Sequence, residues 1–393
     1  MRNKIIVLGA TGSIGTQCLD ILQYSLDYEL VGVSFQSRFE RLEPYLFYFD
    51  SLKYVAITDE KAAMEFHQRH PYYTVFSGED ANLELIRTCN DADVFNSMIG
   101  NCGLRPTLLA MRQNQDIMLS NKESLVIGSS LIAREAKKSS SHIYPVDSEH
   151  VALAKLIEAV KECGVDKKDI TSYIVTASGG ALRDVKKENL KDVTPAQVLH
   201  HPTWAMGSKI TIDCATLVNK GYEVIEASVL FDVPLEKVSA IICRESLVHA
   251  RLEYLEDGQK KMIQEYSPCS MKVPIAYALS KGELKMHQNN SEDTENIKKL
   301  HFQDIDTDFY PAFLYTIQTY RKHGNVGMIY YNAVDTLAID CFLKGCISYL
   351  QLLEALRYTY NHLDHLPELT EENLKEVIKE ADRFAKDVLD KIQ

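Results

Sequence analysis

Residues 4–15, with the sequence KIIVLGATGSIG, decide the fold of the first part of the chain. The apolar run at 4–8 predicts a buried strand, and the helical spacing of the apolar residues after the turn predicts a helix over 16–24. A glycine turn between a strand and a helix is typical of dinucleotide binding, because small residues let the backbone approach a pyrophosphate at the helix N-terminus. The spacing is GxxGxxG rather than the usual GxGxxG, so a tight turn without a ligand stays an alternative.

The same alternation of strand and helix continues downstream. Apolar runs bounded by turn residues predict strands, and helical spacing predicts helices between them. This alternation is typical of a doubly wound parallel sheet, so the expected fold class is α/β with a Rossmann-like N-terminal sheet. The expected strands are 4–8, 30–34, 54–57, 94–98, 117–119 and 141–145, and the expected helices include 79–89 and 106–113.

The end of the second expected strand bears on the choice of cofactor. An acidic residue there would bind the ribose 2′-hydroxyl of NAD, whereas a basic residue accommodates the 2′-phosphate of NADP. The segment 34–38 contains Ser37 and Arg38 and no carboxylate. The composition of this segment therefore favours NADPH over NADH. The alternative is that Arg38 only caps the loop or lies in solvent, without a cofactor contact.

The character of the chain changes after residue 147. Short strands and helices indicate a mixed α+β region, and the last part of the chain keeps helical spacing after a polar stretch without periodicity. The expected strands of this region are 174–176, 238–243 and 247–254, and its helices are 151–163 and 216–230. We expect a nucleotide-binding domain at 1–147, an α+β domain at 148–281 with a lid loop at 200–209, a linker at 282–309 and a helical domain at 310–393.

Composition and charge exclude several classes of protein. Lys and Arg number 43 and Asp and Glu number 55, so the formal net charge is −12 and a nucleic-acid surface is not expected. The first apolar run is too short for a signal peptide, and no run approaches the ~20 residues of a membrane span. The nine cysteines form no CxxC pair, which favours reduced thiols in the cytoplasm over disulfides or structural zinc.

Two segments carry carboxylates in a pattern that suits a divalent metal. Asp147 and Glu149 are two residues apart and point the same way if the chain is extended there. Glu223 lies one helical turn from Asn219 on one face of an expected helix. Carboxylates that leave open positions suit Mg²⁺ or Mn²⁺, which also bind substrate oxygens. Capping of the following helix by Asp147 or its neighbour Ser148 is the simpler alternative.

Other segments place polar or aromatic groups where a ligand would bind. Lys122 follows an expected strand. A lysine there could transfer a proton or contact an anion, and an ordinary surface lysine is the alternative. The turn Ser-Gly-Gly at 178–180 can donate backbone N–H groups and a hydroxyl to a phosphate. The only tryptophan, Trp204, lies in a glycine-ended loop between His201 and Met206. This loop indicates a lid, with an aromatic packed on its own domain as the alternative.

Together these segments resemble the 1-deoxy-D-xylulose 5-phosphate reductoisomerase family, whose members use NADPH and a divalent metal in non-mevalonate isoprenoid biosynthesis. The resemblance runs in one order across most of the chain, and its most specific part is the pair DSEH and NKGYE. The matching motifs are GATGSIG at 9–15, SNKES at 120–124, PVDSEH at 145–150, TASGG at 176–180, HPTWAMGSKITID at 201–213, NKGYEVIEA at 219–227 and GMIYYNAVDTLAIDCFL at 327–343.

The resemblance implies a role for each matching residue. Lys122, Asp147 and Glu149 would be catalytic, and Asp147, Glu149 and Glu223 would hold the metal. Substrate contacts would come from Ser148, Ser178, His201, Trp204, Met206, Cys214, Asn219, Lys220 and Glu223. NADPH contacts would come from Gly9, Thr11, Gly12, Ser13, Ile14, Ser37, Arg38, Asn121, Glu123 and Gly207.

The implied reaction has two stages. The metal would chelate the ketone and a neighbouring hydroxyl of the substrate while the carbon skeleton rearranges, by retro-aldol cleavage and recombination, to a branched aldehyde phosphate. NADPH would then reduce the aldehyde to 2-C-methyl-D-erythritol 4-phosphate, with the lid excluding water. The resemblance also implies a homodimer formed through the middle domain, with a small phosphorylated sugar as ligand and neither nucleic acid nor membrane as partner.

The chain departs from the family pattern at several places. Cys214 stands where the family has a serine that helps to bind phosphate, and a thiol is the weaker donor. The metal and lysine positions are intact, so we expect the same reaction, with phosphate affinity the property most affected. The other departures are Ala181-Leu182 for Pro-Phe, Cys243-Arg244-Glu245-Ser246 for His-Pro-Gln-Ser, and PCSMK at 268–272 for a Pro-Asp-Met-Arg segment.

Two rival functions stay open on the sequence alone. A semialdehyde dehydrogenase of the GATG type would use a cysteine nucleophile, with Cys102 as the candidate, and would need no metal. That function leaves the DSEH and NKGYE segments without a role. A non-catalytic NADP-sensing protein on the same scaffold would bind the cofactor without metal-dependent turnover.

Overall fold

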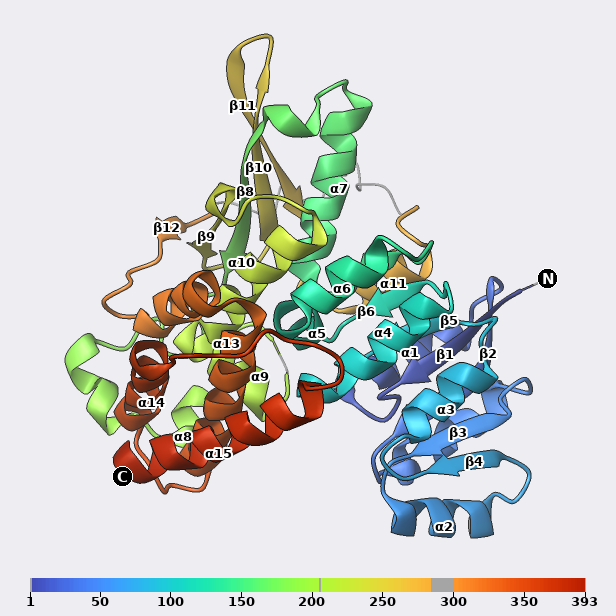
Figure 1. Ribbon diagram of the computed structural model, residues 1–393. Helices are drawn as coiled ribbons and strands as arrows, with labels where there is room; N and C mark the ends of the chain where they lie inside the picture. Colours follow the sequence, from blue (N-terminus) through green and yellow to red (C-terminus); the bar gives the residue numbers. More distant parts are fainter. Residues whose placement is uncertain (1, 205, 284–299, 393) are drawn as a thin grey trace. The chain divides into compact units, whose positions relative to one another are not determined.

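The computed structural model describes residues 2–204, 206–283 and 300–392, which form two compact units (Figure 1). The first unit contains the described residues of 1–148 and 270–284, and the second contains those of 149–269 and 285–393. The chain therefore returns to the first unit for one short segment. The finer division with a separate domain at 310–393 stays a prediction, and most of the predicted linker lies at 284–299, outside the described residues.

The first unit is built on a parallel sheet. Its strands are β1 (Asn3–Leu8), β2 (Tyr28–Phe35), β3 (Tyr54–Ile57), β4 (Thr74–Ser77), β5 (Asp93–Asn96), β6 (Ile117–Leu119) and β7 (Ile143–Pro145). Within the described residues they run in the order β4-β3-β2-β1-β5-β6-β7, with β2 on one side of β1 and β5 on the other. The chain order therefore reverses at β1, and the carboxyl ends of the strands at such a reversal form the ligand crevice of a doubly wound sheet.

Helices cover this sheet with their apolar faces. They are α1 (Ser13–Leu22), α2 (Glu60–Arg69), α3 (Ala81–Thr88), α4 (Leu104–Arg112), α5 (Lys122–Ile127), α6 (Ser129–Ala136) and α11 (Lys272–Leu279). Ile5 and Val7 of β1 and Cys18 of α1 are fully buried in one core cluster. Ile275 of α11 joins the same cluster, and α11 packs against α1. This packing explains why a late segment of the chain belongs to the first unit.

The second unit contains a mixed sheet. Its strands are β8 (Ile170–Ala177), β9 (Val238–Cys243), β10 (Val248–Glu256), β11 (Gln259–Tyr266) and β12 (Phe302–Asp304). In the described part of the chain their order is β11-β10-β8-β9-β12, and β8 and β9 are the parallel pair. The turn at Asp257 and Gly258 joins β10 to β11, and both residues have a positive φ. β11 therefore lies at an edge of the sheet.

The helices that carry the candidate site are α7 (Ser148–Glu162), α9 (Ser208–Thr216) and α10 (Val218–Leu230). Leu153 of α7 and Val224 of α10 are buried with the strands in one core cluster. Leu217 separates α9 from α10 and has a left-handed φ of 58°. The single helix predicted over 216–230 is therefore wrong at its start. A left-handed conformation costs a non-glycine residue about 1–2 kcal/mol, and the burial of Leu217 offsets that cost.

The C-terminal part is helical, as predicted. It consists of α13 (Pro311–Leu343), α14 (Tyr349–His362) and α15 (Leu374–Ile392), which pack on one another, and α13 also contacts α9 and α10. By length and composition alone α13 could cross a membrane, but 72% of its most apolar window is buried inside the protein. Polar residues interrupt the helix, so its sequence shows no unbroken apolar run. Packing in the core explains its composition.

The structure confirms the predicted strands and helices, with shifts at their ends, and adds others. Neither β4 nor β11 is assigned by the sequence patterns, because both are largely exposed and lack a continuous apolar face. β12 lies within the predicted linker and pairs with β9, so that linker is not wholly irregular. A short helix, α8 (Pro195–Val198), precedes the predicted lid and begins with a capping box at Thr194.

Candidate active site

The glycine turn lies at the carboxyl end of β1 and opens α1. Gly9 has a φ of +77°, and a Cβ there would lie 2.7 Å from the carbonyl oxygen of Ser97, so only glycine fits. The backbone N–H of Ala10 donates to the carbonyl of Ser34 at 2.8 Å, which ties the turn to β2. Gly12 is the N-cap residue of α1, and the first turn of that helix contains no acidic residue. The positive end of α1 therefore suits an anion.

Ser37 and Arg38 lie where the sequence predicts, exposed directly after β2. Sequence reasoning missed a second arginine in this region. Arg41 donates from Nη1 to the carbonyl oxygen of Thr11 at 3.3 Å, so its guanidinium lies at the glycine turn. Arg41 ends the short 3₁₀ helix Phe39–Arg41, for which Arg38 is the N-cap residue, and no sequence pattern indicated its contact with the turn.

Lys122 and Asp147 meet at the carboxyl ends of β6 and β7. Lys122 Nζ lies 2.7 Å from Asp147 Oδ2, and the lysine side chain is only 12% exposed. It is therefore not an ordinary surface lysine. Next to it, the Asn121 side chain donates to the carbonyl of Gly100 at 3.0 Å and to Glu123 at 3.1 Å. These bonds hold the SNKES segment in one defined conformation at the end of its strand.

Glu149 and Glu223 form a carboxylate pair in the second unit. Their carboxylate oxygens lie within 4.8 Å of one another, and Glu223 is 2% exposed. Lys220 Nζ lies 3.1 Å from Glu149 Oε1 and also pairs with Glu223. The Asn219 side-chain amide donates to Glu223 at 2.5 Å, which confirms the predicted shared face of α10. Two carboxylates so close need a cation between them, and Lys220 supplies one here.

One detail of the predicted carboxylate geometry is wrong. The chain is not extended through 147–149, because α7 begins at Ser148 and Glu149 lies in its first turn. Side chains two residues apart do not share a face of a helix, so extended spacing cannot align Asp147 with Glu149. Asp147 instead directly precedes α7 and pairs with Lys122. Asp147 therefore lies just before α7, in the segment that joins β7 to α7, and Glu149 lies in the first turn of that helix.

Two buried histidines support the carboxylate pair, and neither was predicted as a site residue. His150 donates from Nε2 to the backbone carbonyl of Glu223 at 3.0 Å, and its Nδ1 lies 3.5 Å from Glu226. This bond fixes α10 against α7 at the height of Glu223. His249 Nδ1 lies 3.8 Å from Glu149 Oε1, while its Nε2 donates to the carbonyl of Ser267 at 3.2 Å. His150 is the last residue of the DSEH motif, so its place beside the carboxylates could have been predicted from that motif. No sequence pattern indicated His249.

The turn at 178–180 follows β8 and has the conformation that the two glycines require. Gly179 and Gly180 have φ values of +85° and +68°. A Cβ on Gly180 would lie 2.7 Å from the Cα of Ala215, so the turn packs directly on α9. The Ser178 hydroxyl oxygen accepts the backbone N–H of Gly180 at 3.0 Å. The predicted phosphate turn therefore lies beside the helix that carries Cys214.

His201 joins the lid loop to this turn in one defined tautomer. Its Nδ1 accepts the backbone N–H of Trp204 at 2.9 Å and that of Thr203 at 3.2 Å, so Nδ1 carries no proton. The proton is therefore on Nε2, which donates to the Ser178 hydroxyl oxygen at 3.0 Å. Burial, assisted by the charge of Arg183, lowers the pKa of His201 to about 4. The imidazole is neutral at physiological pH.

The titration of His201 should make stability depend on pH in a defined direction. The unfolded chain binds a proton on this histidine near pH 6.5, whereas the folded protein does so only near pH 4. Between these values the unfolded state binds more protons, so the contribution of His201 to stability falls as pH falls from 6.5 towards 4. We expect the difference in unfolding free energy between wild type and His201→Asn to shrink between about pH 7 and pH 5. Urea unfolding at both pH values measures it, and a constant difference would contradict the assignment.

The described residues of the lid loop fold against the second unit. The rings of Trp204 and His249 meet edge to face with their centroids 6.2 Å apart, and Met206 is half-buried. Ala205 lies outside the described residues. Gly207 is the N-cap residue of α9, so the lid ends where the helix of Cys214 begins. The lid tryptophan thus packs on a histidine that itself faces Glu149.

Three ranges of the chain match models of one known protein family. Residues 5–129 match the family description 1-deoxy-D-xylulose 5-phosphate reductoisomerase, residues 143–231 its C-terminal domain, and residues 266–388 the DXP reductoisomerase C-terminal domain. The reductoisomerase of Lysinibacillus sphaericus is 38% identical over 90% of this chain and 91% of its own length, and that of Thermotoga neapolitana is 36% identical over 96% and 93%. The chain belongs to the 1-deoxy-D-xylulose 5-phosphate reductoisomerase family.

Solved structures of reductoisomerases agree with this assignment. The enzyme from Zymomonas mobilis in complex with NADPH is similar with a TM-score of 0.85 and 27% identity, and the match covers 99% of each chain. A reductoisomerase in complex with NADPH, fosmidomycin and magnesium is similar with a TM-score of 0.86 over 99% of this chain and 98% of its own. The predicted fold class and family are therefore confirmed.

The rival nucleophile, Cys102, has no feature of an activated thiol. Desolvation around its sulfur raises the pKa of Cys102, although the residue as a whole is exposed. Its Sγ donates to the carbonyl oxygen of Ile99 at 2.9 Å. A catalytic thiol requires a lowered pKa, so reductoisomerase chemistry accounts for this chain better than a semialdehyde dehydrogenase does.

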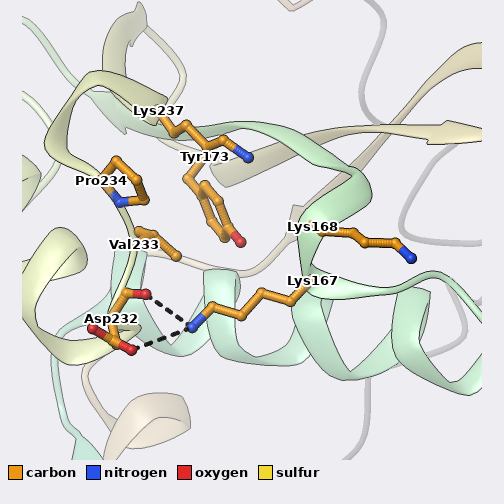
Figure 2. Close-up of a pocket in the computed structure, with 7 residues that line it drawn as sticks. All are labelled: Lys167, Lys168, Tyr173, Asp232, Val233, Pro234 and Lys237. Atoms are coloured by element: carbon orange, nitrogen blue, oxygen red, sulfur yellow. Dashed lines mark hydrogen bonds and ion pairs between the residues drawn. The ribbon is translucent and has the colours of Figure 1, made fainter.

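A cavity of about 300 Å³ lies elsewhere in the second unit of this reductoisomerase (Figure 2). Its walls are formed by Lys167, Lys168, Tyr173, Asp232, Val233, Pro234 and Lys237. Lys167 and Lys237 each donate to a backbone carbonyl at 2.8 Å, and Lys168 pairs with Asp166 at 3.0 Å. Because each ammonium group already has a partner, the cavity does not resemble a built anion site.

Proposed function

We propose that this chain catalyses the NADPH- and divalent-metal-dependent isomerisation and reduction of 1-deoxy-D-xylulose 5-phosphate to 2-C-methyl-D-erythritol 4-phosphate, in non-mevalonate isoprenoid precursor biosynthesis. The observation that carries the proposal is the pair of Glu149 and Glu223 bridged by Lys220. A structural core has no need for two close carboxylates and an ammonium at one point, since such a cluster is costly to bury. A metal-dependent enzyme that binds a phosphorylated substrate needs all three.

Asp147, Glu149 and Glu223 are the residues that we assign to the metal. They offer only oxygen donors, which suit Mg²⁺ and Mn²⁺. When bound, a divalent ion supplies Lewis acidity toward the ketone and hydroxyl oxygens of the substrate. His150 and Asn219 orient Glu223 through its carbonyl and its carboxylate. Such supporting bonds fix the direction of a ligand before it binds.

Ser178, Cys214, Asn219 and Lys220 are the residues that we assign to the substrate phosphate, and Ser148 to the substrate hydroxyl. Lys220 supplies the positive charge for the phosphate and the turn at 178–180 supplies a hydroxyl and backbone donors. Lys122, which lies at the carboxyl end of β6 beside Asp147, is the residue that we assign to a substrate oxygen on which negative charge develops. His201, Trp204 and Met206 would close over the substrate and exclude water.

The cofactor belongs at the carboxyl edge of the first sheet. We assign the pyrophosphate to the N-terminus of α1 and the 2′-phosphate to Ser37 and Arg38, with Arg41 as a further cation beside them. NADPH then supplies the hydride for the second stage of the reaction. The contacts assigned to the cofactor are Gly9, Thr11, Gly12, Ser13, Ile14, Ser37, Arg38, Asn121, Glu123 and Gly207.

The substitution Cys214→Ser tests the departure from the family pattern at a residue that we assign to the phosphate. A hydroxyl is a stronger donor than a thiol, so we expect KM for 1-deoxy-D-xylulose 5-phosphate to stay the same or to fall, by up to about tenfold. Steady-state kinetics measures it, with the exposed Cys346→Ser as a matched control. A clear rise in KM for the Cys214 variant alone would show that the thiol does not face the phosphate.

We also propose that the protein is a homodimer formed through the second unit and that it works in the cytoplasm. β11 is an edge strand, and the hairpin that it forms with β10 exposes Leu255 and Met262. An unpaired strand edge with exposed apolar side chains is a ready template for pairing with a second copy. The nine cysteines are free thiols, which suits a reducing compartment. Light scattering on the purified protein tests the dimer, and a monomer at micromolar concentration would contradict it.

Product analysis tests the proposed reaction. The purified protein is incubated with 1-deoxy-D-xylulose 5-phosphate, NADPH and Mg²⁺, and the product is identified by NMR. We expect 2-C-methyl-D-erythritol 4-phosphate in equal amount to the NADPH consumed, and the same activity in Cys102→Ser. Turnover that depends on Cys102, or cofactor binding without turnover, would instead support one of the two rival functions.

A further inference from the structure

The backbone carbonyls of the turn at 178–180 are occupied by two side chains that the family pattern does not assign to the site. Arg183 Nη1 donates to the carbonyl oxygen of Ser178 at 2.9 Å and to that of Arg244 at 2.7 Å. The hydroxyl of Tyr310 donates to the carbonyl oxygen of Gly179 at 2.9 Å. Burial raises the pKa of Tyr310 to about 12, so this hydroxyl stays a donor. The carbonyls of Ser178 and Gly179 are therefore bonded within the protein.

The hydroxyl of Ser178 is also restricted to one role. Its oxygen accepts His201 Nε2–H at 3.0 Å and the N–H of Gly180 at 3.0 Å. A hydroxyl has two acceptor sites and one proton, so the two acceptor sites are filled and the proton is left to donate. The Ser178 hydroxyl therefore offers a donor, and the carbonyls of Ser178 and Gly179 are occupied. A phosphate monoester is mostly the dianion at neutral pH and offers mainly acceptors, so such a turn suits it.

Arg183 also brings a positive charge to the turn. Its side chain is 16% exposed, and its Nε is buried without a hydrogen-bond partner among the described residues. The carboxylate of Asp184 lies 3.7 Å away and is itself mostly exposed, while Arg244 binds the same carboxylate at 2.5 Å. Arg244 replaces the proline of the family pattern, so this chain has a second arginine that competes with Arg183 for Asp184. The charge of Arg183 is consequently only weakly neutralised.

We propose that Arg183 and Tyr310 are positioning residues for the substrate phosphate, which act by occupying the carbonyls of the turn at 178–180 so that its donors face the ligand. The inference rests on the assignment of Ser178 to the phosphate under the proposed function. Arg183 has two effects, because it fixes the turn and adds a positive charge beneath it. Tyr310 has only the first effect. Both residues act through the turn and are not in contact with the reacting carbons.

Four variants separate these effects. Arg183→Met removes the charge and both bonds, Arg183→Lys keeps the charge with a shorter donor, and Tyr310→Phe removes one hydroxyl and keeps the ring. Arg251→Met is the matched control, because Arg251 is a half-buried arginine of β10 in the same unit that bonds Gln264 and stacks on Phe302. The measurements are the dissociation constant of inorganic phosphate by phosphorus NMR, KM for the sugar phosphate, KM for NADPH and kcat.

We expect Arg183→Met to raise the phosphate dissociation constant and KM for the sugar phosphate together, by about tenfold or more. KM for NADPH should stay within about twofold and kcat should change less than KM, because only ground-state positioning of the phosphate is lost. For Arg183→Lys, the phosphate dissociation constant and KM for the sugar phosphate should lie between those of Arg183→Met and wild type. Tyr310→Phe should raise the same two constants by about threefold. Arg251→Met should have the same phosphate dissociation constant, KM values and kcat as wild type.

Two results would overturn the inference. One is unchanged phosphate affinity in Arg183→Met when wild type binds phosphate, and the other is an equal rise in the constants for NADPH and for the sugar phosphate. If Arg183→Met does not fold, Tyr310→Phe decides, since it removes a single oxygen and unchanged affinity there contradicts the inference. The direct phosphate titration is independent of turnover. A wild type that binds phosphate through Arg183 but does not convert the sugar phosphate would overturn the proposed function and leave this inference standing.

Discussion

Replacing Glu149 by glutamine is expected to lower the rate of metal-dependent turnover by about three orders of magnitude. The amide has nearly the same shape but no charge, so it weakens the binding of a divalent cation and removes one half of the carboxylate pair. Lys220 would then pair with Glu223 alone, one turn away on α10. Steady-state oxidation of NADPH at saturating Mg²⁺ measures the loss, and a metal titration of the variant shows whether the affinity for the ion has fallen as well.

The control for this experiment lies on the same helix. Glu158 is an exposed residue of α7 that pairs only with Lys161 at 3.7 Å among the interactions described, so Glu158→Gln changes the same chemical group on the surface. Its turnover should match that of wild type. If Glu149→Gln kept wild-type activity at every Mg²⁺ concentration, Glu149 would not be a metal ligand.

Replacing Lys209 by methionine is expected to destabilise the second unit by about 3–5 kcal/mol. Lys209 Nζ lies 2.8 Å from Asp213 on α9 and 2.7 Å from Asp335 on α13, and Asp335 is fully buried. Burial and the charge of Asp335 raise the pKa of Asp213 well above its usual value, so Asp213 can remain protonated beside a charged Asp335. The lysine is then the cation that compensates the buried charge, and removing it leaves that charge unpaired.

A double variant distinguishes a charge effect from a loss of packing. Asp335→Asn in the Lys209→Met background removes the unpaired carboxylate, so it should restore more than half of the lost unfolding free energy. Lys167→Met is the matched control, since Lys167 and Asp232 form an exposed ion pair at 3.9 Å and such pairs contribute less than about 1 kcal/mol. Urea unfolding followed by the fluorescence of Trp204 measures all of them. Equal stabilities of the single and double variants would contradict the account.

Much of the fold could be predicted because local patterns and packing agree in the first unit. Residues 5–8 are buried on both faces of the sheet, so they form a continuous apolar run that is followed by the glycine turn. Gly9 occupies a position that only glycine can adopt, which makes the motif visible in the sequence. β11 and β12 could not be predicted, because an exposed edge strand has no apolar face to reveal it.

The candidate site was predictable where residues lie close in sequence and not where distant segments meet. Asn219 and Glu223 are one helical turn apart, so helix geometry alone predicts their contact. The contact of Lys220 with Glu149 spans 71 residues and depends on how α7 packs against α10. Arg183 and Tyr310 reach the turn at 178–180 from elsewhere in the fold, and an arginine or a tyrosine alone gives no sequence signal for such a role.

We propose that turnover by this reductoisomerase depends on a divalent ion held by Asp147, Glu149 and Glu223. The most direct measurement follows the oxidation of NADPH with 1-deoxy-D-xylulose 5-phosphate after removal of divalent ions and again after addition of Mg²⁺ or Mn²⁺, for wild type and Glu149→Gln. We expect no oxidation of NADPH without the ion, full recovery of the rate when the ion is added to wild type, and almost no recovery in the variant. Oxidation of NADPH by the metal-free wild type at the same rate would contradict it.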